Sequence, residues 1–254
     1  MKKVTLFLFV VSLLPSTVLA WNTPGEDFSG ELKLEGAVTS TRNPWVWKVG
    51  QGNESLEVKQ SRSVRDGRQV IPVALPALTV LLGKTTLTTP AGREGLSPRV
   101  SYGKGTEEFS LEWTAPGMAE VALPVTGNKN VRAGTFTFRM QAVGVLRHMQ
   151  DGQPVYVGVY DDLKVNGLPG ESTAMKASDI PDVLQKMFSG EGPSWLQTMT
   201  VSGYSGVSHF SDAALRQVEG VYGAQVVAGS GELHLNGAMP EHWRVSLSVS
   251  IEYQ

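Results

Sequence analysis

Strict alternation of apolar and polar residues at both ends of the chain constrains its fold more than any other feature. Near the start, apolar residues or glycine occupy every second position, at Phe28, Gly30, Leu32, Leu34, Gly36 and Val38. At the end the same spacing recurs at Val245, Leu247, Val249, Ile251 and Tyr253. A period of two residues is typical of a β-strand with one buried face. Both ends are therefore predicted to be strands, over residues 28–38 and 244–253.

The rest of the chain is also predicted to be mostly strands. Shorter segments with strand character are expected at residues 44–50, parts of 70–82, 99–102, 109–113, 119–124, 134–147, 155–161, 220–228 and 231–236. One helix is predicted over residues 178–188, with Ser178 or Asp179 as its cap, Pro181 in its first turn and Gly190 after its end. Many strands with a single helix favour an all-β sandwich over a parallel α/β fold.

The first twenty residues have the three parts of a secretory signal peptide. Lys2 and Lys3 precede an apolar run from Val4 to Leu14, and Val18-Leu19-Ala20 places small residues where a signal peptidase cleaves. An apolar run of about 11 residues is too short to span a bilayer, which needs roughly 20. The mature chain is thus expected to begin at Trp21 and to be exported.

Composition excludes several classes of function. Without residues 1–20 the chain keeps 20 Lys and Arg against 24 Asp and Glu, and its basic residues are not clustered. A nucleic-acid partner is therefore not expected, because phosphate binding needs concentrated positive charge. The chain has no cysteine. Unlike many exported domains it must be held together by burial, hydrogen bonds or a partner.

No pattern for catalysis or metal binding is present in the sequence. The four histidines do not stand at metal-ligand spacings from one another, and Gly203-Tyr204-Ser205-Gly206 departs from the G-x-S-x-G motif. We therefore predict no enzyme activity and no cofactor. Trp45 and Trp47 lie two residues apart on a predicted strand and face the same way. They are either core residues, an inter-subunit contact, or a stacking surface for a sugar ring.

The two predicted terminal strands give the main indication of function. Residues 28–38 lie almost at the mature N-terminus, and two glycines replace bulky residues on their apolar face. Such a strand is either the first strand of its own sandwich or a strand that inserts into a groove of another molecule. The last strand would expose unpaired N–H and C=O groups at a sheet edge unless something pairs with it.

Several short motifs along the chain resemble Fae-type fimbrial subunits assembled by the chaperone–usher route. In that family the mature chain begins with Trp, as at Trp21 here. The other matching segments are Asp27-Phe28-Ser29-Gly30 with Gly36 and Thr39, then Trp45–Gly50, Leu81–Thr85, Val121–Pro124 and Val249–Tyr253. The sequence is most similar to a minor subunit of this family.

The resemblance implies an incomplete immunoglobulin-like β-sandwich whose seventh strand is supplied by another molecule. It implies a donor-strand extension over residues 21–40 and an immunoglobulin-like domain over 41–254, with a small helical insertion around 162–202. A periplasmic chaperone would dock along a C-terminal strand that includes Leu247, Val249, Ile251 and Tyr253. The donor strand, with Phe28, Gly30, Leu32, Leu34, Gly36 and Val38, would then fill a neighbouring subunit.

The resemblance also implies what the protein does and where. It would be a structural minor subunit, exported through the periplasm, passed to an outer-membrane usher and built into a cell-surface fimbria that supports adhesion. The alternative is an adhesin that binds host glycans itself. In the major subunit a helical insertion carries receptor binding. Residues 162–202 hold only one clear helix, so receptor binding is not transferred to this chain.

Overall fold

The computed structural model describes residues 43–53, 56, 58, 63–65, 68–128 and 131–254. The predicted signal peptide (1–20) and donor-strand extension (21–40) lie outside these residues. None of the helices in the described part of the chain is both long and apolar enough to cross a membrane. All the structural statements below concern the domain that begins at Arg42.

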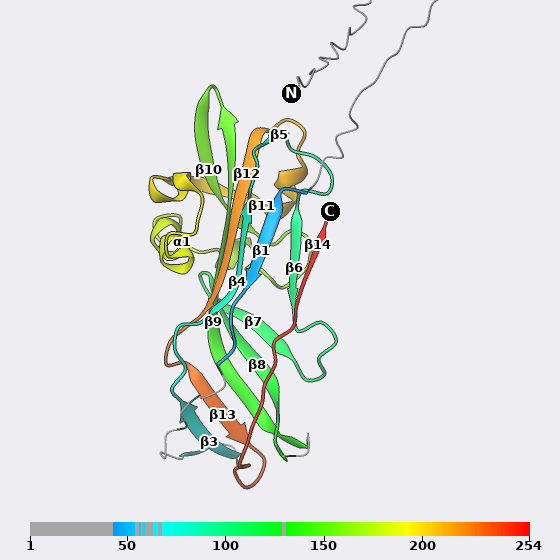
Figure 1. The fold of residues 1–254 in the computed structure, drawn as a ribbon, viewed down its shortest axis with the longest axis vertical. Coiled ribbons are helices and arrows are strands. Elements are labelled where there is room, and N and C mark those ends of the chain that lie inside the picture. The colour runs from blue at the N-terminus through cyan, green and yellow to red at the C-terminus, as the bar shows by residue number, and fades with distance from the viewer. Residues whose placement is uncertain (1–42, 54–55, 57, 59–62, 66–67, 129–130) are drawn as a thin grey trace, which may run out of the picture. The chain divides into compact units, whose positions relative to one another are not determined.

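Strands make up most of the regular structure, as Figure 1 shows. A small sheet pairs β14 with β6, and a larger sheet contains the other twelve strands. The strands are β1 (Trp45–Val49), β2 (Ser63–Arg65), β3 (Arg68–Val73), β4 (Thr79–Thr85), β5 (Thr89–Ala91), β6 (Pro98–Tyr102), β7 (Ser110–Ala115), β8 (Met118–Thr126), β9 (Arg132–Gln150), β10 (Gln153–Tyr160), β11 (Val201–Gly206), β12 (Arg216–Val226), β13 (Gly231–Leu235) and β14 (Val249–Tyr253). The predicted all-β, sandwich-like architecture with one small helix is confirmed.

The long strand β9 organises the larger sheet. It pairs with β8, β10, β12 and β13, so its two halves belong to different parts of the sheet. Phe136, Phe138 and Met140 are buried on one face, while Thr135 and Thr137 are half-buried on the other. This is the predicted alternation, and it directs the aromatic side chains into the main core.

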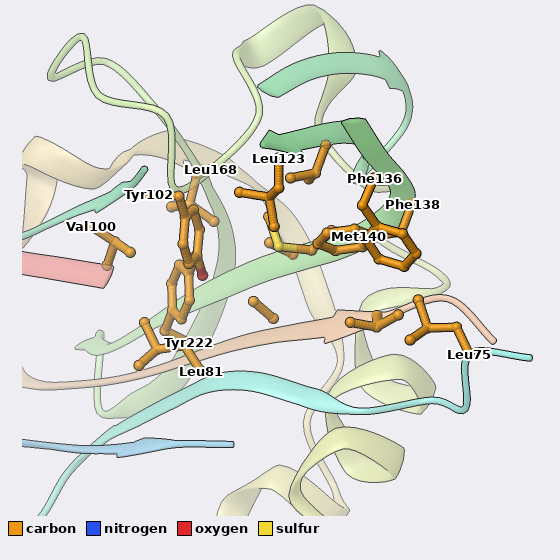
Figure 2. Packing of buried hydrophobic residues seen from close by; sticks show 14 of the residues in the cluster. Leu75, Leu81, Val100, Tyr102, Leu123, Phe136, Phe138, Met140, Leu168 and Tyr222 are labelled. Carbon is orange, nitrogen blue, oxygen red and sulfur yellow. The ribbon is translucent and has the colours of Figure 1, made fainter. Parts of the chain in front are cut away.

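Two buried tyrosines connect the two sheets through the main core. Tyr102 of β6 and Tyr222 of β12 meet with their hydroxyl oxygens 2.9 Å apart, and Figure 2 shows the two rings end to end. Tyr222 donates its proton to the carbonyl oxygen of Gly167, so Tyr102 must donate to Tyr222. Burial raises the pKa of both phenols, which keeps both protons in place.

The segment between β10 and β11 forms a second core on the larger sheet. Its helix α1 (Ile180–Phe188) buries Ile180, Leu184, Met187 and Phe188, and these side chains pack with residues of β4, β9 and β12. Two 3-10 helices, η2 (Glu171–Thr173) and η3 (Ser194–Gln197), complete this region, and a third, η4 (Val207–Ser211), follows β11. The predicted helix is therefore confirmed, with an amphipathic stripe that faces the sheet.

The ends of α1 differ in how well the sequence predicted them. Pro181 lies in the first turn, and Ser189 and Gly190 after the end adopt positive φ values of 47° and 88°, as helix C-termini often do. The predicted side-chain cap is wrong. Asp179 makes no capping hydrogen bond and instead accepts one from the Ser178 hydroxyl.

A loop of the same region completes the free edge of β6. Asn166 donates from its side chain to the carbonyl oxygen of Tyr102 and accepts from the Tyr102 N–H, at 3.0 and 2.7 Å. The N–H of Gly167 donates to the carbonyl oxygen of Val100 at 3.0 Å. These bonds imitate a neighbouring strand, so β6 is paired on both sides.

The C-terminal strand is shorter than predicted. Regular pairing begins at Val249, although Arg244 already forms a bridge with Thr126 at the end of β8. Between these points Ser248 accepts a backbone hydrogen bond from Gly103. The C-terminal segment therefore follows β8 first and β6 afterwards, as the red trace in Figure 1 shows.

Candidate functional site

The last strand of the chain has an open edge. Gln254 exchanges backbone hydrogen bonds with Ser97, and Ser248 accepts one from Gly103. Because the backbone direction alternates along a strand, the N–H and C=O groups of Val249, Ile251 and Tyr253 point away from β6. None of the strands in the described part of the chain pairs with that edge.

The first described strand, β1, has an open edge as well. Just before β1 the carbonyl oxygen of Pro44 accepts from the N–H of Thr86 at 2.9 Å, and just after β1 the N–H of Gly50 donates to the carbonyl oxygen of Val80 in β4 at 3.2 Å. The backbone groups of Trp47 and Val49 therefore point to the opposite side, where β1 ends the order of strands in its sheet. The backbone groups along these two edges pair with no strand in the described part of the chain, so each edge can accept a further strand.

Side chains next to these two edges face inward but stay uncovered. Val49 shares the face of the buried Trp45, yet it is 62% exposed. On the other side Tyr253 is 38% exposed, and the alternate positions before it pack against the core while remaining half-buried, at Trp243, Val245, Leu247, Val249 and Ile251. We refer to the space between β1 with Leu56 and the segment Trp243–Tyr253 as the open groove.

The two ends of the open groove differ. At one end the indole N–H of Trp47 donates to the Tyr253 hydroxyl at 2.8 Å, so the walls touch. At the other end lies a cavity of about 720 Å³, which is lined by Gly52, Asn53, Leu56 and residues 241–245. The groove is therefore narrow beside the C-terminus and wide beside Leu56 and Trp243.

The predicted tryptophan pair is part of the groove wall and core. Trp45 is 6% exposed, and its ring stacks on Trp47 with centroids 5.2 Å apart while Phe210 meets it edge-on. Its N–H donates to the carbonyl oxygen of Leu96 at 3.0 Å. The Trp45 ring thus has no open face for a sugar ring, and the pair fits the core interpretation.

Charged side chains form ion pairs outside the groove. Glu252 accepts a hydrogen bond from Lys104 at 2.6 Å, and this bond holds the pKa of its carboxyl below the usual value. The hydrogen bond from Lys48 of β1 lowers the pKa of the Glu191 carboxyl in the same way. Exposed pairs of this kind contribute little stability, but they mark the outward face of both walls.

The groove offers backbone donors and acceptors along the edges of β1 and β14 and apolar side chains along both walls. Among the residues that the structure describes, no three His, Asp or Glu side chains are grouped so that they could hold a metal ion. An extended, alternating apolar segment is the ligand that satisfies such a surface.

The structure brings together some predicted residues and adds others. Val249, Ile251 and Tyr253 lie on β14, and Leu247 lies just before it. All six predicted donor-strand residues lie outside the described residues. Sequence reasoning missed Val49, Leu56 and Trp243 as wall residues. Val49 could have been found, because it continues the alternation of Trp45 and Trp47.

Comparison with known proteins agrees with this geometry. The whole chain, residues 1–254, matches the family described as fimbrial, major and minor subunit. Over 254 residues it is 91% identical to the K88 minor fimbrial subunit FaeI of Escherichia coli, with 100% of both chains covered. The predicted Fae-type minor subunit is thereby confirmed, as is the expectation of a non-enzymatic protein that associates with other fimbrial subunits at the cell surface. The chain belongs to the K88-type family of fimbrial major and minor subunits.

Proposed function

We propose that this minor subunit joins the fimbria by donor-strand exchange through the open groove. The strand of a neighbouring subunit fills the groove, and the subunit's own strand, residues 28–38, fills the groove of the next. A periplasmic chaperone occupies the groove first and delivers the subunit to an outer-membrane usher. Residues 1–20 direct export to the periplasm, and the finished fibre supports adhesion.

The observation that carries this proposal is the pair of uncovered, inward-facing walls. Half-buried apolar side chains and unpaired backbone groups both destabilise a free subunit, because each exposes surface that a fold normally covers. One inserted strand covers the apolar side chains and pairs with the backbone groups at the same time. The groove segment Trp243–Tyr253 has eleven residues, which is also the length of the predicted donor strand, Phe28–Val38.

Such an exchange accounts for growth in one direction. The surface that receives a strand differs from the strand that is given, so each contact is heterologous and the chain of contacts does not close on itself. A fibre follows from a single type of contact.

Appending the donor strand to the C-terminus tests this function. A second copy of residues 21–40, joined after Gln254 by a linker of about four residues, can fold back along β14. Covering the groove should stabilise the domain by about 5 kcal/mol or more. For a domain of this size that corresponds to an unfolding midpoint about 10–20 °C higher. We expect the fusion to purify as a monomer without chaperone.

The matched control carries Leu32→Ser and Leu34→Ser in the appended copy only. It keeps the length and the backbone groups of the strand but lacks two apolar side chains. We expect it to aggregate like the subunit with nothing appended after Gln254. Equal solubility and equal midpoints for both fusions would refute donor-strand filling of the groove. Calorimetry and size-exclusion chromatography provide the two readouts.

A further inference from the structure

Three consecutive residues before β6 contact both walls of the groove. The Asn43 side chain donates to the carbonyl oxygen of Gly95 at 2.7 Å, and the Trp45 indole donates to that of Leu96 at 3.0 Å. The next residue, Ser97, exchanges backbone hydrogen bonds with Gln254 at 3.3 and 3.1 Å. The segment Gly95–Ser97 thus joins the start of β1 to the end of β14.

Further hydrogen bonds make this junction rigid. Ser97 is fully buried, and its hydroxyl donates to the carbonyl oxygen of Ser208 at 3.1 Å. The Ser211 hydroxyl lies 2.8 Å from that of Ser97 and donates to the carbonyl oxygen of Gln254 at 3.1 Å. Asn43 also accepts the Trp45 N–H at 3.0 Å. These contacts fix the beginning of β1, the end of the chain and the segment Gly95–Ser97 between them.

The spacing between the walls matters for any strand that enters. Neighbouring strands lie about 4.8 Å apart, so two edges that pair with one inserted strand must stand about 9.6 Å apart. β1 and β14 belong to different sheets, so backbone pairing between them does not set this distance. Packing between the two sheets, as at Tyr102 and Tyr222, and hydrogen bonds at the end of the groove set it instead.

We propose that Gly95–Ser97 form a clamp that fixes the width of the groove at its narrow end, with Asn43 and Trp45 as positioning residues. The inference rests on the proposed strand exchange, because width matters only if a strand enters. The clamp holds β1 through the side chains of Asn43 and Trp45 and holds β14 through the backbone of Gln254, and it does not contact the incoming strand itself. It prepares the acceptor for pairing at both edges before the strand arrives.

Uptake of a labelled peptide tests the clamp. The subunit is used as its complex with the periplasmic chaperone, and the probe is a peptide with the sequence of residues 21–40. Asn43→Ala removes two hydrogen bonds at the clamp and is expected to slow uptake about tenfold. Trp45→Phe keeps an aromatic ring but loses the bond to Leu96, and it is a second variant should Asn43→Ala fail to accumulate.

A matched control exists in the insertion. The buried indole N–H of Trp195 has no hydrogen-bond partner among the described residues, so Trp195→Phe removes an indole without breaking such a bond. It should leave uptake within about twofold of the wild type. Equal slowing by Trp45→Phe and Trp195→Phe would overturn the clamp.

Shortened peptides separate a clamp from general destabilisation. The slowing by Asn43→Ala should persist with one of the peptides 31–40 and 21–35 and disappear with the other, since only one of them pairs with the end of the groove beside the clamp. Equal slowing with both, or none with either, would overturn the inference while leaving the proposed function intact. A wild-type subunit that takes up no peptide at all would instead contradict the proposed function itself.

Discussion

Replacing Leu247 with aspartate is expected to lower the periplasmic level of the subunit more than tenfold. Leu247 packs against the main core from the groove wall and is only half-buried. Losing this side chain costs about 2 kcal/mol of burial, and a carboxylate that an inserted strand covers without a partner costs about 2 kcal/mol or more in addition. Neither the chaperone nor a neighbouring subunit could then fill the groove. Immunoblots of periplasm from cells that co-express the chaperone measure the effect.

The adjacent residue provides the control for this substitution. Ser246 lies on the same segment but is exposed on the outward side. Ser246→Asp introduces the same charge one residue away and should leave the level within about twofold, because exposed surface substitutions usually change stability by less than 0.5 kcal/mol. Similar losses for both variants would show that the groove face of this segment has no special role.

Gly83→Val is expected to have the second largest effect, because it displaces a groove wall. A Cβ atom at Gly83 would lie 2.3–2.8 Å from three ring carbons of Trp47. Trp47 would have to leave its stack on Trp45 and release Tyr253. Overpacking of this kind costs about 1–3 kcal/mol, and the lost hydrogen bond adds about 1 kcal/mol. The unfolding midpoint of the strand-filled fusion should fall by about 10 °C.

Gly203→Val is the corresponding control. Gly203 lies on β11, and a Cβ atom there would meet nothing within 4 Å. The same glycine-to-valine change should therefore move the midpoint by no more than about 2 °C. If Gly83→Val moved it as little, Trp47 would not be fixed in the wall as the structure describes.

Local patterns predicted the elements whose periodicity depends on one buried face. The alternation of Phe136, Phe138 and Met140 with threonines predicted β9, and the stripe from Ile180 to Met187 predicted α1. In both cases the side chains that face the core recur at the period of the element itself. Such information is present in a short window of the sequence.

Other elements could not be predicted because their causes lie far away in the chain. β11 contains Gly203 and Gly206, and glycine is depleted in strands. It is a strand because it pairs in parallel with β10. The groove is another example. Trp47 and Tyr253 are 206 residues apart, so alternation predicted that the last strand has an open edge but not which strand forms the opposite wall.

The central claim is that a strand of one subunit pairs beside β14 of another, and disulfide trapping tests it most directly. The chain has no cysteine, so any disulfide reports only introduced residues. One subunit would carry Val249→Cys in the groove and a second Leu34→Cys in the predicted donor strand, with Leu32→Cys to test the neighbouring register. After strand exchange the account predicts a disulfide-linked pair of subunits from one of these inward positions, and none from the outward Lys33→Cys. Equal trapping from inward and outward positions, or no trapping between subunits, would contradict it.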